Sequence, residues 1–179
     1  MDLNGAQKLS LIAAIITAVA TYIFYWCVAL VPVASADPVY VNGIGFIKNL
    51  ADLFGNPNTN ANKTGLPLVF YYAFIVFFII LIASPILQVL GIKRKEGPLV
   101  GCIMPLLTSI FIVLYALFGF APIFIKLLAV YMGDTTPLVE GIFPITLTYG
   151  DRFEFFGTYV LMGGGVISLI AGLKGSRKF

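Results

Sequence analysis

The feature that most constrains this chain is a set of four long stretches without a charged residue. Three of them run for 23 residues and the fourth for 19, and they cover residues 9–31, 68–90, 99–121 and 155–173. A helix of about 20 apolar residues crosses the roughly 30 Å hydrocarbon core of a bilayer. Because lipid offers no partner to backbone polar groups, each stretch is expected to be helical. The sequence therefore predicts an all-α integral membrane protein, a single domain built as a four-helix transmembrane bundle.

The overall composition supports a membrane protein. Hydrophobic residues make up 60% of the chain and charged residues 11%, whereas soluble domains carry roughly 45–50% and about 25%. The first stretch is expected to be retained as a span, because its apolar run is longer than the usual 7–15 residues of a cleaved signal peptide.

The distribution of charge predicts how the spans are oriented. Seven cations lie near the two termini and in the short loop 91–98: Lys8, Lys93, Arg94, Lys95, Lys174, Arg177 and Lys178. Seven cations and two acids leave +5 on this side, and four cations and six acids leave −2 on the other. Since cations flank spans on the cytoplasmic side, we expect both termini in the cytoplasm at the cell membrane. The loops 32–67 and 122–154 are then outer loops.

Small residues predict which helices pack against each other. Helices in lipid associate where small side chains let their backbones approach. The fourth span carries Gly164, Ser168 and Gly172 at intervals of four, and the first carries Ala14 and Ala18. These are the predicted helix-packing residues, and we expect the first and fourth helices to contact each other.

The second and third spans each contain one proline, Pro85 and Pro105. A proline inside a helix removes a hydrogen bond and favours a kink, so both residues are predicted kink sites at similar depth. No Asp, Glu, Lys or Arg lies in any span, which disfavours a pump or an ion-coupled transporter. Gln88 and Thr17 are polar residues within the spans, and the sequence indicates no function for them.

The first outer loop contains a pattern typical of a short amphipathic helix. Apolar residues recur with helical spacing over 46–54, and Gly55 and Pro57 follow. The segment 39–41 before Asn42 and Gly43 could instead open a hairpin, and the two interpretations compete for residues 44–46. We favour the helix. In the second outer loop, residues 145–149 alternate like a strand and could pair with 39–41 as a small β element.

Two further features lie outside the four spans. The polar tip 56–64 of the first outer loop contains Asn62-Lys63-Thr64, an acceptor pattern for glycosylation at Asn62. Residues 123–132, which include Lys126, extend too far to belong to the third span. We expect that segment to leave the membrane or to lie along its surface, where a lysine can reach water.

The residue types available exclude several kinds of chemistry. The chain has no histidine, which removes bis-histidine haem, histidine-ligated metal sites and Ser-His or Cys-His catalytic pairs. Its two cysteines, Cys27 and Cys102, lie roughly 20 Å apart in depth by helical rise, too far for a disulfide. No catalytic, cofactor or metal site is predicted, the chain is not expected to be an enzyme, and nothing points to nucleic acid.

The resulting functional hypothesis is a non-catalytic accessory subunit of a larger membrane protein complex, with a respiratory or other energy-converting assembly as one candidate host. Its expected partners are other integral membrane subunits and lipid. One alternative is a surface or envelope protein that binds partners through its outer loops. Another is a small oligomeric channel or carrier for neutral or lipophilic substrates.

Overall fold

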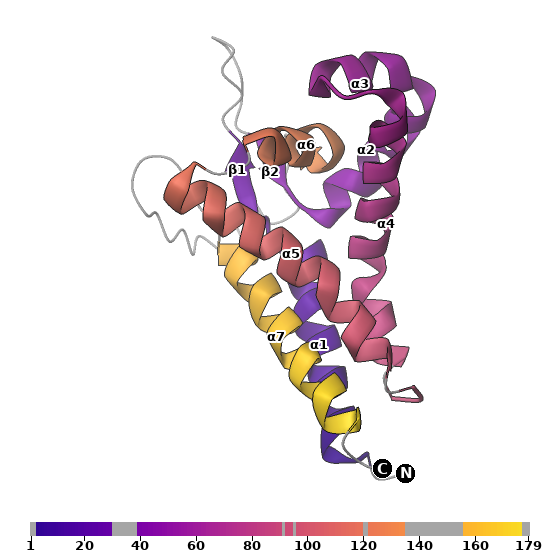
Figure 1. Ribbon diagram of the computed structural model, residues 1–179, viewed down its shortest axis with the longest axis vertical. Helices are drawn as coiled ribbons and strands as arrows, with labels where there is room; N and C mark the ends of the chain where they lie inside the picture. Colours follow the sequence, from indigo (N-terminus) through magenta and orange to yellow (C-terminus); the bar gives the residue numbers. More distant parts are fainter. Residues whose placement is uncertain are drawn as a thin grey trace.

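The computed structural model describes residues 3–29, 39–90, 92–94, 96–119, 122–134 and 156–176, which are mostly helical. The elements follow in the order α1 (Gly5–Tyr22), β1 (Cys27–Ala29), β2 (Val39–Val41), α2 (Gly43–Gly55), α3 (Pro57–Thr64), α4 (Leu68–Leu90), α5 (Glu96–Phe118), α6 (Pro122–Met132), β3 (Gly133–Asp134) and α7 (Phe156–Ser176). Figure 1 shows that α1 begins and α7 ends at the same end of the molecule, near the α4–α5 turn.

Within the described part of the chain, four helices are long and apolar enough to cross a membrane: α1, α4, α5 and α7. The structure therefore confirms two predictions: the chain is mostly helical, and it has four helices that could span a membrane. Helix α7 contacts α1 and α5, and α4 contacts the same two helices, so the four form a closed bundle (Figure 1). Large apolar side chains such as Ile15, Val76 and Val166 are exposed on its outside, as a surface in contact with lipid requires.

Helix α1 is shorter and starts earlier than the span predicted over residues 9–31. It begins after Asn4, whose side chain accepts a hydrogen bond from the Gln7 backbone while the Gln7 side chain accepts one from Asn4, a capping box. It ends at Tyr22, and the Trp26 indole donates to the carbonyl of Ala20 at 2.8 Å. That indole satisfies a carbonyl that the end of the helix leaves unpaired, and the chain continues into a strand.

Residues 43–64, in the predicted first outer loop, fold into two helices that lie beside the half of α4 away from the α4–α5 turn (Figure 1). Helix α2 covers the predicted amphipathic segment and buries Phe46 and Leu53. Residues 44–46 belong to α2, so the predicted helix forms and the alternative hairpin at Asn42 and Gly43 does not. Strand β2 ends at Val41, and Asn42 then caps α2 by accepting from the Gly45 backbone at 2.7 Å. The polar tip forms the short helix α3, with proline in its first turn.

The small sheet has the order β1-β2-β3, with antiparallel pairs throughout. Strand β2 is central: Val41 pairs with Cys27 on one side and with Gly133 on the other. The segment that contains α2 and α3 is therefore joined to the end of α1 and to the segment that follows α6. The strand predicted over residues 145–149 lies outside the described residues.

Candidate functional site

A single amide, Gln88, joins three transmembrane helices near the α4–α5 turn. Its side chain is fully buried, and its Nε2 donates to the Gly101 carbonyl of α5 at 3.0 Å. That carbonyl lacks its helical partner because Pro105, four residues later, has no N–H group. The Ser10 hydroxyl of α1 donates to the backbone carbonyl of Gln88. Gln88 therefore connects α1, α4 and α5 through its side chain and its backbone.

The close approach of α4 and α5 at this point depends on Gly101. A Cβ atom there would lie 2.7 Å from Cγ of Gln88 and 3.1 Å from the carbonyl oxygen of Ser84. Contacts this short require a neighbour to move, so only glycine lets α5 bring its carbonyl to the amide. The Oε1 atom of Gln88 is buried and has no hydrogen-bond partner among the described residues. The amide thus acts here as a donor.

A second amide holds the α4–α5 turn against the start of α1. The Gln7 side chain uses its oxygen for the capping box, and its Nε2 donates to the Ile92 carbonyl at 2.8 Å. The turn itself is closed by backbone hydrogen bonds from Lys93 and Arg94 to the Leu90 carbonyl. One end of the bundle is therefore fixed by contacts between segments far apart in the sequence.

One of the predicted packing residues, Gly164, lies at the interface of α1 and α7. Gly164 of α7 faces Thr17 of α1, and a Cβ atom on Gly164 would come within 2.4 Å of the threonine Oγ1. On α1, Ala14 is buried and Ala18 is half-buried. Because Gly164 has no side chain, the two helices can lie this close to each other.

The other two predicted packing residues of α7 face α5 instead. The Ser168 hydroxyl donates to the carbonyl of Pro98 at 2.8 Å. A Cβ atom on Gly172 would lie 2.5 Å from the side chain of Leu99. The stripe of small residues therefore has two neighbours: Gly164 contacts α1, and Ser168 and Gly172 contact the first turns of α5.

Both predicted kink residues, Pro85 and Pro105, are buried within helices that continue past them. Nearby hydroxyl groups donate back to their own helices, Ser84 to the Ile80 carbonyl at 3.0 Å and Ser109 to the Pro105 carbonyl at 2.7 Å. The kinks themselves stay a prediction. The chemical effect of Pro105 is clear, because the carbonyl it frees accepts the Gln88 amide.

At the opposite end, α6 fills the space between α4 and α5, which meet at their turn and diverge away from it (Figure 1). The ring of Phe124 lies 6.4 Å from that of Phe77 on α4 and 5.0 Å from that of Phe111 on α5, between centroids. Helix α6 corresponds to the segment 123–132 that the sequence places outside the third span. Its role as a wedge between two spans was not predicted.

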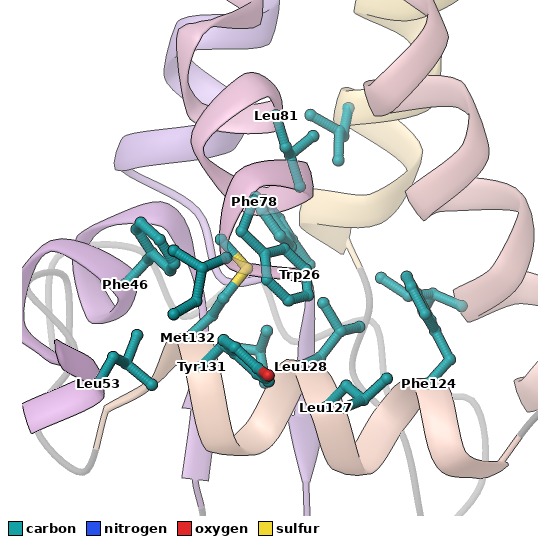
Figure 2. Close-up of a cluster of buried hydrophobic side chains, with 14 of the residues drawn as sticks. Trp26, Phe46, Leu53, Phe78, Leu81, Phe124, Leu127, Leu128, Tyr131 and Met132 are labelled. Carbon is teal, nitrogen blue, oxygen red and sulfur yellow. The ribbon is translucent and has the colours of Figure 1, made fainter. Parts of the chain in front are cut away.

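Helix α6 is also joined to α2 through a buried aromatic cluster around Phe78 (Figure 2). The Tyr131 hydroxyl donates to the backbone carbonyl of Tyr71 at 3.1 Å, and the Tyr71 hydroxyl donates to that of Leu53 at 2.9 Å. Burial, followed by the nearby Tyr71, raises the pKa of Tyr131 well above its ordinary value. The phenol therefore stays a neutral hydrogen-bond donor. We call α2, α3, α6 and the sheet the cap.

The candidate glycosylation residue, Asn62, is exposed on α3. The threonine of its acceptor pattern, Thr64, is buried, and its hydroxyl donates to the Ala61 carbonyl at 2.7 Å. The adjacent network is polar. Hydrogen bonds from Asn60 and then Asn56 lower the pKa of the Asp52 carboxyl below its ordinary value.

Metal chemistry finds no support in the part of the chain that the structure describes, since no group of three or more Cys, Asp or Glu side chains gathers there. Cys102 is buried, and its thiol contacts the Leu99 carbonyl at 3.1 Å. The side chain of Cys27 lies outside the described set, so the predicted absence of a disulfide stays a prediction.

Sequence reasoning missed Gln88, because a lone amide near the end of a span carries no motif. One signal could have found it. Pro105 predicts a free carbonyl at Gly101, and in an antiparallel hairpin Gln88 and Gly101 lie at similar distances from the turn.

Comparison with known proteins gives no relative: no family model, no curated protein and no solved structure matches this chain.

Proposed function

We propose that this chain is a non-catalytic accessory subunit of a larger membrane protein complex, inserted in the cell membrane with both termini in the cytoplasm. A respiratory or other energy-converting assembly is one candidate host. The main support for the proposal is the set of hydrogen bonds that polar side chains form between the helices of the bundle. Ser10, Gln88 and Ser168 all give their hydrogen bonds to backbone carbonyls of neighbouring helices. Such bonds fix the helices relative to one another, which suits a subunit that presents a constant surface.

The outward faces of α4 and α5 are the surfaces that such a subunit would present. Their exposed side chains are large and apolar, and they include Val76, Ile79, Ile86, Val100, Ile103, Leu107 and Ile110. Close packing of apolar side chains is one of the contacts by which helices associate in lipid. The proposed partners are therefore other integral membrane subunits, with lipid on the remaining faces.

Copurification tests this function. The full-length chain, extracted from native membranes in a mild detergent, is expected to bring other membrane proteins with it in stoichiometric amounts. Migration as a lone monomer would contradict the proposal. Four variants place one tryptophan on the outside of each transmembrane helix: Ile15→Trp, Ile79→Trp, Ile110→Trp and Val166→Trp. We expect Ile79→Trp and Ile110→Trp, on the proposed surface, to lose the partners, and Ile15→Trp and Val166→Trp to keep them, with helix content unchanged in all four.

A further inference from the structure

The end of the bundle near the α4–α5 turn carries exposed cations from three segments. Lys8 lies in the first turn of α1, Lys93 and Arg94 lie in the turn, and Lys174 lies in the last turn of α7. We infer that these four side chains form a binding surface for the phosphate headgroups of anionic phospholipids. This inference is independent of whether the chain is an accessory subunit.

The three segments are held together by specific contacts. The Gln7 side chain donates to the Ile92 carbonyl. Because Gln7 directly precedes Lys8, this hydrogen bond holds the turn beside the start of α1. Gly172 lies directly against Leu99, which fixes the last turns of α7 beside the start of α5. The three segments that carry the cations therefore lie at one end of a fixed scaffold (Figure 1).

The charge at this end is not balanced by the protein. Glu96 is the one carboxylate that the structure describes there, so four cations and one acid leave +3. Among the described residues, no salt bridge joins these cations to a carboxylate. At the opposite end, by contrast, Lys63 donates to the side chain of Asn60 at 3.2 Å. An anionic headgroup layer supplies the missing negative charge, and each basic side chain near such a surface contributes about 1 kcal/mol.

The apolar residues next to these cations select lipid over a free phosphate. Val89 and Leu90 precede the turn, and Val100 and Ile103 follow it, and between 43% and 48% of each side chain is exposed. An acyl chain can lie along this surface while its headgroup reaches the turn. A soluble phosphate would gain nothing from these side chains, because the hydrophobic contribution depends on apolar area removed from water.

Lipid selectivity of the reconstituted protein tests the inference. The full-length protein is placed in phosphatidylcholine vesicles with a small fraction of spin-labelled phosphatidylglycerol, and electron spin resonance measures how much label the protein immobilises. We expect phosphatidylglycerol to be preferred over spin-labelled phosphatidylcholine. The variant K93Q/R94Q should lose most of this preference, by up to about fivefold per charge removed. The matched variant K48Q/K63Q removes two cations from the other end and should keep it.

Two further measurements keep the test decisive if K93Q/R94Q does not fold. Raising the salt from 0.1 to 1 M shortens the Debye length from about 10 to about 3 Å, so the preference of the unaltered protein should fall sharply. Glycerol phosphate added to the solution should leave the labelled lipid in place. An unchanged preference in K93Q/R94Q, a preference insensitive to salt, or displacement of the lipid by glycerol phosphate would each overturn the inference.

Discussion

Replacing Gln88 by leucine tests whether the hydrogen bond from its amide to the Gly101 carbonyl holds α4 and α5 together. Pro105 leaves that carbonyl without a partner inside α5. The change removes the hydrogen bond to Gly101, which has a net value of about 0.5–1.5 kcal/mol, and leaves that buried carbonyl unpaired at about 1–3 kcal/mol. It also removes the unpaired Oε1 atom of Gln88, which offsets part of this loss. We expect a net loss of about 1–2 kcal/mol in the free energy of unfolding.

A second substitution, Pro105→Ala, tests whether Gln88 and Pro105 act on the same carbonyl, that of Gly101. Alanine restores the N–H group that can donate to the Gly101 carbonyl within α5. In that background Gln88→Leu should cost much less, which gives a coupling energy of about 1–2 kcal/mol in a double-mutant cycle. Pro85→Ala serves as the control, because Pro85 lies in α4 and does not free the Gly101 carbonyl.

Denaturant unfolding in detergent, followed by the fluorescence of Trp26 and by helix content, measures the free energy of unfolding of the unaltered protein, of each single variant and of each double variant. Trp26 is the single tryptophan of the chain and is fully buried, so its emission reports loss of structure around it. Additive effects of Gln88→Leu and Pro105→Ala would refute the idea that the two residues act on the same carbonyl. Equal coupling with Pro85→Ala would refute its specificity.

Three further predictions concern other parts of the fold. Gly164→Ala places a methyl group against α1 and should destabilise the bundle by about 1–3 kcal/mol, whereas Gly163→Ala, with nothing within 4 Å, should have little effect in the same unfolding assay. Phe124→Ala should cost about 3–5 kcal/mol by removing the ring between α4 and α5, and Phe118→Ala, at a ring that is 76% exposed, should stay near neutral. The lowered pKa of Asp52 predicts that the cap has its full stability above pH 3.8, the ordinary value, and loses stability as the pH falls through the lower folded value. Near-ultraviolet circular dichroism of the cap aromatics should show this acid transition in the unaltered protein and lose it in Asp52→Asn; an identical transition in both would contradict the assignment.

The sequence predicted α2 well and the end of α1 poorly, for a physical reason. In α2 the spacing of Phe46 and Leu53 directly reflects which face is buried. At the end of α1, residues 22–26 are aromatic or apolar, so hydropathy cannot distinguish a continuing helix from a turn. Helix α1 ends where Trp26 donates to the Ala20 carbonyl and where the following residues pair with the distant strand β2. Hydropathy reveals neither contact.

In the candidate site, too, the sequence indicated which residues matter but not which residues they contact. The small residues of α7 were visible in the sequence, but their partners were not, because a stripe at intervals of four does not say which neighbour lies beside each turn. Gly164 faces α1, whereas Ser168 donates to α5. The aromatic content of α4 and α5 likewise did not indicate that Phe124 inserts between the halves of these helices that lie away from their turn.

The central position of β2 in its sheet has a consequence for how the protein is assembled as it is synthesised. Strand β2 has β1 on one side, but its other neighbour, β3, ends at Asp134, after two more transmembrane helices and α6 have been made. The hairpin of α4 and α5 must therefore enter the bilayer while the sheet beside it is incomplete. Helix α7 follows these segments in the chain and packs next to α1, which precedes them. The interface between α1 and α7 therefore forms only after all the segments between them have been made.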